Sequence, residues 1–140
     1  MPHVVLIGSV SIETIFRKLH PILIQDGSDI LRTKEIYLER KKNVILIDSL
    51  VIESEQKVGF FTIISGRDKS LVIRLFPNSQ LKKTKSIKRL LAEIAKKLMQ
   101  SFPDLTLGET NLEDYLKWIK ISHLEIDCFL KEFKLNKYSQ

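Results

Sequence analysis

Four β-rich runs that are separated by very short polar links constrain the fold of this chain more than any other feature. The runs span roughly 31 to 40, 44 to 53, 58 to 65 and 70 to 76, and each link between them has three or four residues. Links of this length suit hairpins, but they are too short for the crossover helix that parallel strands need. The four runs are therefore predicted to form an antiparallel meander.

Two stretches of helical period flank the meander. The first follows an apolar run, His3 to Gly8, which predicts an opening strand. Its helix starts at Ser11, a favourable N-cap, and stops before Pro21. The second lies between Pro77 and Pro103 and has one apolar stripe, formed by Ile87, Leu90, Leu91, Ile94, Leu98 and Phe102. The predicted fold class is α+β in the order β-α-β4-α, an antiparallel meander sheet with two amphipathic helices on one face.

The C-terminal part of the chain is predicted to be a helical extension over 111–135. Asp104 to Leu107, after Pro103, are compatible with a short added strand. Thr110 and Glu113 then match the capping-box pattern that starts a helix. The sequence has no repeat, low-complexity tract or interdomain linker. We therefore expect a single α+β domain over 1–135 and a frayed tail over 136–140.

The strands of the meander have apolar residues at adjacent positions, so apolar side chains point to both faces of the sheet. The runs VILIDSLVI over 44–52 and SLVIRLF over 70–76 do not alternate strictly between apolar and polar residues. Such strands favour a sheet that is covered on both faces. The C-terminal helices or a second subunit would cover the face that the two helices leave free, so a homo-oligomer is expected.

Composition bounds the location and the cofactors. The single cysteine, Cys128, cannot close a disulfide within the chain, which indicates a reducing, cytoplasmic location. No apolar run reaches the roughly 18 residues of a membrane span, and the N-terminus has no basic segment typical of a signal peptide, so no membrane contact is expected. His3, His20 and His123 are far apart and lack paired ligands, so no metal site and no cofactor is predicted.

The positive charge of the chain is concentrated in one stretch, KKTKSIKRLLAEIAKK over 82–97. The stretch holds seven of the 23 basic residues and one of the 17 acidic residues, so sixteen of each remain elsewhere and the net charge of +6 belongs to this element. On a helix, these cations would share the face opposite the apolar stripe. The candidate anion-binding residues are Lys82, Lys83, Lys85, Lys88, Arg89, Lys96 and Lys97.

Three of these lysines crowd the predicted helix N-terminus. Lys82, Lys83 and Lys85 lie where the helix itself carries partial positive charge, an arrangement that a bound anion would relieve. The stretch is either a solvated face or a contact for an anionic partner, a nucleic acid or an acidic protein. The polar face lacks aromatic residues for base stacking, so phosphates would be contacted. About five phosphate contacts predict a log–log salt slope of about −4 to −5.

A second feature lies at the start of the chain. Met1-Pro2-His3 followed by an apolar strand resembles the opening of the tautomerase superfamily, particularly its carboxymethyl-hydroxymuconate isomerase branch. The resemblance covers the first few residues and a loose element order. It implies an enzyme in which Pro2, exposed by removal of Met1, is the general base, while Arg32 holds the substrate carboxylate.

The sequence therefore favours a small cytoplasmic α+β binding module that contacts an anionic partner through the basic helix over 82–97. It favours this interpretation over an enzyme without excluding enzymatic activity. A tautomerase-like enzyme that uses Pro2 is the first alternative. A structural or oligomeric protein-interaction domain is the second.

Overall fold

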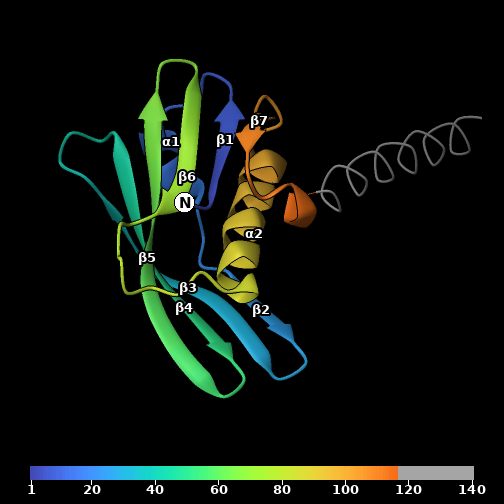
Figure 1. Cartoon of the computed structure of the whole chain (residues 1–140). Helices are drawn as coiled ribbons and strands as arrows, with labels where there is room; N and C mark the ends of the chain where they lie inside the picture. The colour runs from blue at the N-terminus through green and yellow to red at the C-terminus, as the bar shows by residue number, and fades with distance from the viewer. Residues whose placement is uncertain (117–140) are drawn as a thin grey trace, which may run out of the picture.

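The computed structural model describes residues 1–116, and it contains a curled, seven-stranded antiparallel sheet with helices (Figure 1). The strands are β1 (His3–Ile7), β2 (Leu23–Asp26), β3 (Asp29–Leu38), β4 (Val44–Glu53), β5 (Gln56–Arg67), β6 (Ser70–Leu75) and β7 (Thr106–Thr110). The helices are α1 (Ile12–Lys18) and α2 (Lys85–Ser101). The strand order across the sheet is β2-β3-β4-β5-β6-β1-β7. The predicted α+β class and the antiparallel sheet are confirmed.

The strands β3 to β6 occupy the four β-rich runs, and each pairs antiparallel with the next. The β4–β5 hairpin is the most regular, with ten consecutive residue pairs from Val44 opposite Ser65 to Glu53 opposite Gln56. Its turn residues, Ser54 and Glu55, adopt positive φ angles of 52° and 65°. This conformation matches the twist of the flanking strands in a two-residue hairpin, so the short links do enforce local pairing.

The predicted order β-α-β4-α was incomplete, because it lacked the two edge strands. The short, mostly exposed β2 pairs with β3 through a turn at Gly27, whose φ is 61°. The dipeptide Asp26-Gly27 is a hairpin signal that could have revealed it. At the other edge, β7 pairs with β1, and the missing side chain of Gly108 leaves room for Ile7, which would lie 3.0 Å from an added Cβ. This strand overlaps the short strand suggested at Asp104 to Leu107, but its pairing with the free edge of β1 is not shown by the local sequence.

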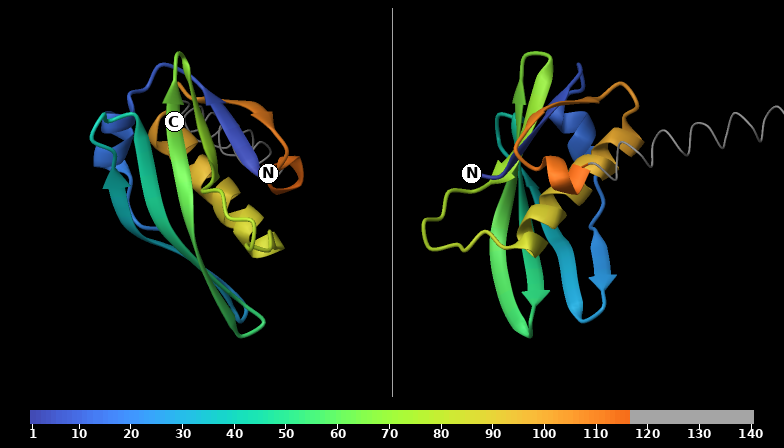
Figure 2. Two further views of the ribbon diagram at one scale, coloured as in Figure 1. Left: turned by 60° about the vertical axis from the view of Figure 1, so that its left-hand side comes forward. Right: turned by 45° about the vertical axis from the view of Figure 1, so that its right-hand side comes forward.

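Alternate residues of the strands point to the inner side of the sheet, where α2 lies (Figure 2). Ile12 and Ile15 of α1 belong to the same buried core cluster as the apolar stripe of α2 and the inner strand residues. The inner strand residues in this cluster are Val4, Leu6, Leu31, Ile45, Ile47, Val51, Phe60, Ile64, Leu71, Ile73 and Leu75. One continuous core therefore holds together both helices and five strands, β1, β3, β4, β5 and β6.

The outer side of the sheet is also apolar. Leu50, Ile63 and Val72 are buried but do not belong to the core cluster, and Tyr37 and Phe61 are exposed beside them. The residues predicted to cover this face, in the C-terminal extension, lie outside the described residues. Cover by that extension or by a second subunit stays a prediction.

The described part of the chain ends in a helical turn over 113–116. The Thr110 hydroxyl accepts a hydrogen bond from the Leu112 amide (3.0 Å) and donates one to the His3 carbonyl (2.7 Å). Thr110 therefore ties the turn to β1, whereas a capping box would have required a bond from the Glu113 amide. The rest of the predicted extension over 111–135, and the tail over 136–140, lie outside the described residues.

Gly66 of β5 is a position where the fold requires glycine, and this gives a prediction. A Cβ atom there would lie 2.7 Å from both the Asn43 Oδ1 and the Ile12 Cγ1 atoms, and Ile12 is buried in the core. We expect Gly66→Ala to lower the free energy of unfolding by about 1–3 kcal/mol through overpacking, as measured by urea denaturation.

Gly59, on the same strand, provides the matched control. The nearest atom to an added Cβ at Gly59 is the Ser49 carbonyl oxygen, at 4.0 Å. Gly59→Ala should therefore change the free energy of unfolding by no more than about 0.5 kcal/mol. Equal effects of the two substitutions would show that the close approach of Asn43 and Ile12 is not the reason why Gly66 is required.

Candidate functional site

The basic stretch divides between a loop and a helix. Lys82 and Lys83 precede α2, and the helix begins after Thr84, whose hydroxyl accepts a hydrogen bond from the Ile87 amide (3.4 Å). The first turn of α2 has no acidic residue. The N-terminal end of α2 therefore combines its partial positive charge with several lysines.

The cations of α2 lie away from its buried stripe, but they do not share one environment. Lys88 and Lys97 are nine residues apart, which is about two and a half turns, so they lie on opposite sides of the helix. Lys88 lines a hollow beside the N-terminal segment, and Lys97 lines a different one beside the end of α1. The seven residues therefore occupy separate environments.

Four of them form a group at the N-terminal end of α2, which we call the lysine cluster: Lys82, Lys83, Lys85 and Lys88. Two of its members, Lys83 and Lys88, line a hollow of about 200 Å³ together with Met1, Pro2, Asn111 and Leu112. Among the described residues, no acidic side chain lines this lysine hollow. Within residues 1–116, no member of the cluster takes part in an ion pair.

The wall of the lysine hollow is held in place by Asn111. Its side-chain amide donates to the Met1 carbonyl (2.8 Å), and its Oδ1 accepts from the His3 amide (2.9 Å). These two bonds fix the segment before β1 against the segment after β7, although the two are far apart in the sequence. Sequence reasoning missed Asn111, because its role depends on the pairing of β1 with β7.

Arg89 has a different environment from the lysine cluster. Its guanidinium donates to the Asp26 carboxylate at 2.6 Å, which ties the β2–β3 hairpin to α2. It also lines a hollow of about 380 Å³ with Glu93, Asp114 and Tyr115. Because acidic side chains surround it, we leave Arg89 out of the proposed anion-binding surface.

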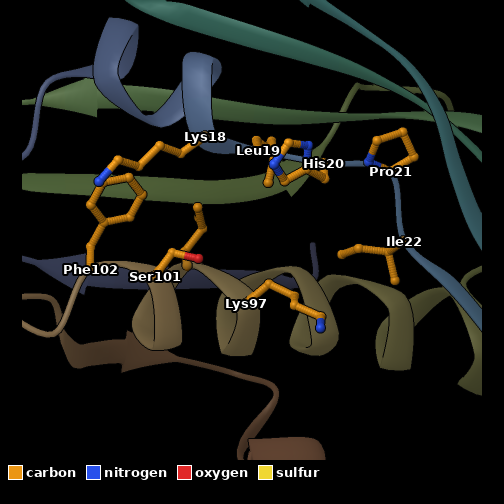
Figure 3. Close-up of a pocket in the computed structure, with 9 residues that line it drawn as sticks. Lys18, Leu19, His20, Pro21, Ile22, Lys97, Ser101 and Phe102 are labelled. Atoms are coloured by element: carbon orange, nitrogen blue, oxygen red, sulfur yellow. The ribbon is translucent and has the colours of Figure 1, made fainter.

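Lys97 lies in the hollow of about 230 Å³ that Figure 3 shows, between the ends of α1 and α2. Lys18 extends across the Phe102 ring there, with its Nζ atom 5.4 Å from the ring centroid, a cation–π geometry. Both helices end at this hollow, and helix C-termini carry partial negative charge. The Phe102 ring and the two helix C-termini therefore offset part of the positive charge of Lys18 and Lys97. This hollow is a weaker anion site than the lysine cluster. Lys96, one residue earlier, is half-buried.

The structure does not bring together the two residues proposed for a tautomerase-like site. Pro2 is buried and lines the lysine hollow, just before β1. Arg32 is exposed on β3, opposite Leu50 of β4. Three strands, β4, β5 and β6, separate β3 from β1. The cations that share a hollow with Pro2 are Lys83 and Lys88.

The described residues also bear on metal binding and on membrane insertion. Within residues 1–116, no three His, Cys, Asp or Glu side chains are grouped as metal ligands would be. Neither α1 nor α2 is long and apolar enough to cross a membrane. His123 and Cys128 lie outside the described residues.

The lysine cluster and its hollow are therefore the candidate site that combines charge, shape and a lack of acidic partners. Comparisons of the chain with models of protein families, with curated proteins and with solved structures found no match.

Proposed function

We propose that this protein is a binding module for the phosphates of a nucleic acid, which it contacts through the lysine cluster at the N-terminal end of α2. The observation that carries the proposal is the cluster of four lysines without an ion-pair partner among residues 1–116, beside a hollow that no acidic side chain lines. The partial positive charge of the helix end adds to their field. An anion placed there would relieve the repulsion between these groups.

The chemistry of the cluster favours phosphate oxygens over base edges. Lysine is a compact, mobile point charge, which suits contacts with a charged backbone more than bidentate reading of bases. The part of the chain that the structure describes places no aromatic side chain in the lysine hollow on which a base could stack. We therefore expect binding that depends strongly on salt and weakly on nucleotide sequence.

The test is a titration of the protein with duplex DNA, single-stranded RNA, heparin and poly-glutamate at several salt concentrations. Four phosphate contacts predict a log–log salt slope of about −3 to −4 for duplex DNA, so affinity should fall about a hundredfold between 50 and 200 mM salt. Tighter binding of poly-glutamate than of either nucleic acid would identify an acidic protein as the partner instead. Indifference to all four polyanions at low salt would overturn the proposal.

A tautomerase-like enzyme is the second candidate, and one observation favours it. Pro2 lies in the same hollow as Lys83 and Lys88, two cations that can take the carboxylate-binding role for which Arg32 is badly placed. The mechanism needs a free secondary amine at Pro2. Intact mass of the purified protein tests it, because retention of Met1 eliminates this candidate.

The proposal also includes a cytoplasmic location and a homo-oligomeric state. The location is supported by the single cysteine, and the oligomer by the apolar character of the outer sheet face. A domain that recognises another protein through its sheet remains the third interpretation.

A further inference from the structure

A row of three side chains crosses the outer face of the sheet, away from the lysine cluster. Asp48 of β4 lies directly opposite Phe61 of β5. Phe76, just after β6, continues the row, because its amide donates to the Phe61 carbonyl (2.8 Å). Directly opposed residues on neighbouring strands point to the same face. One carboxylate and two phenyl rings are thus adjacent on one surface.

These side chains border a hollow of about 320 Å³, which we call the aromatic hollow. It is lined by Asp48, Gly59, Phe60, Phe61, Phe76 and Asn78. Gly59 has no side chain to fill the space, and the nearest atom to an added Cβ there is a backbone oxygen 4.0 Å away. The segment between β6 and α2 swings out on the side of the sheet opposite α2 (Figure 2). Asn78 lies in that segment, where its Oδ1 accepts from the Gln80 amide (3.0 Å).

The chemistry of the aromatic hollow is that of a cation site. The Phe61 and Phe76 side chains are 42% and 51% exposed, so their faces are accessible to a ligand. Asp48 is half-buried, and within residues 1–116 its carboxylate has neither an ion pair nor a hydrogen bond. Aromatic faces attract cations through their quadrupole, and a neighbouring carboxylate adds direct charge attraction.

Two arginines lie on the same face in adjacent rows. Arg74 is opposite Ile63, and Arg32 is opposite Leu50. Neither forms an ion pair with Asp48, so neither neutralises it. A ligand cation would also experience repulsion from these arginines, but the rings and the carboxylate act on it at contact distance. The local chemistry of the hollow therefore differs in sign from the net charge of the chain.

We propose that the aromatic hollow binds an organic cation, an ammonium or guanidinium group that lies against Phe61 and Phe76 and pairs with Asp48. The group comes either from a free amine or from a lysine or arginine side chain of another protein. This site is independent of the lysine cluster, since it lies on the other side of the sheet and takes the opposite charge.

The test compares choline with its neutral isostere 3,3-dimethylbutan-1-ol, followed by NMR shifts of the Gly59 and Phe61 amides. We expect choline to bind about tenfold more tightly or better, because only the cation gains from the rings and the carboxylate. N-acetyl-lysine methylamide and N-acetyl-arginine methylamide distinguish the sources: tighter binding of either than of choline identifies a protein side chain as the ligand. Equal binding of choline and its isostere, or no binding of any cation, would overturn the proposal.

Substitutions in the aromatic hollow test whether choline binds to these residues. Phe61→Leu and Asp48→Asn should each weaken choline binding by about three- to tenfold, and Gly59→Val should abolish it by filling the space. Tyr37→Leu and Asp68→Asn are matched controls, an exposed aromatic residue of the same sheet face and an exposed carboxylate in the β5–β6 turn. They should leave binding unchanged. Unchanged binding in Asp48→Asn would also contradict the proposal.

Discussion

Replacement of the four members of the lysine cluster by glutamine is expected to remove nearly all binding to duplex DNA at low salt. The variant carries Lys82→Gln, Lys83→Gln, Lys85→Gln and Lys88→Gln. Since each contact of a cation with a phosphate releases a counterion, the loss of four contacts should bring the log–log salt slope close to zero and lower affinity about a hundredfold near 50 mM salt. Fluorescence anisotropy at several salt concentrations measures both quantities.

The fold should tolerate this change. Lys82, Lys83 and Lys85 are exposed and Lys88 is half-buried, and none belongs to the core cluster. Removal of four positive charges at the positive end of α2 should even relieve repulsion there. The circular dichroism spectrum should therefore match that of the wild-type protein, so a loss of binding reports on the contact surface.

A control variant separates the cluster from the net charge. Lys41→Gln, Lys57→Gln, Arg67→Gln and Lys69→Gln remove four exposed cations elsewhere, and both variants lower the formal charge from +6 to +2. Lys42 is left unchanged, because its hydrogen bond to Glu13 lowers the pKa of that carboxyl and is part of the structure. The control should keep most of the affinity. Equal losses in the two variants would mean that binding follows total charge and that the cluster has no special role.

The central meander was predictable because its information is local. Links of three or four residues leave adjacent runs no choice but to pair, and the observed strands β3 to β6 pair in that way. The strand β2 was not predicted, and for β7 the sequence suggested a short strand near 104–107 but not its partner, which is distant in the chain. β7 pairs with β1 across about a hundred residues of chain. Only the Asp26-Gly27 turn offered a local sign of β2.

The sequence predicted which residues carry the positive charge of the site, but not that the fold places them in separate environments. The apolar stripe of α2 correctly identified its core side, since Ile87, Leu90 and Ile94 are fully buried. The sequence prediction treated all remaining positions as one surface. In the fold, the segment around Leu112 contacts one side of the helix and the end of α1 lies near the other. These neighbours separate Lys88 from Lys97, and no periodicity argument could have placed them.

The aromatic hollow was also not predictable from the sequence. Asp48, Phe61 and Phe76 are far apart in the sequence, and each looks like an ordinary strand residue. Their adjacency follows from the register of the β4–β5 and β5–β6 pairs, which a slip of one residue would destroy by turning side chains to the other face. The strand register therefore determines whether the carboxylate and the two rings lie on one surface.

Leu90→Ala is expected to cause a large loss of stability. The Leu90 side chain is fully buried in the core cluster between the helix and the inner face of the sheet. Its truncation removes apolar contact and leaves a cavity, which should lower the free energy of unfolding by about 2–5 kcal/mol in urea denaturation. Gln100→Ala, an exposed position on the same helix, should change it by no more than about 0.5 kcal/mol. A loss below about 1 kcal/mol for Leu90→Ala would contradict the packing of α2 on the sheet.

Leu90→Ala and the four-glutamine variant should have opposite signatures, and that contrast is the strongest check on the division of α2 into a core side and a binding end. Leu90 lies on the sheet-facing side of the helix and does not line the lysine hollow. At temperatures where the folded state of Leu90→Ala still predominates, its DNA affinity should equal that of the wild type, because the cluster and its cap at Thr84 are unchanged. The four-glutamine variant should show wild-type stability without affinity. If Leu90→Ala lost affinity while it remained folded, the lysine cluster would have to depend on the position of α2 against the sheet as well as on its own charges.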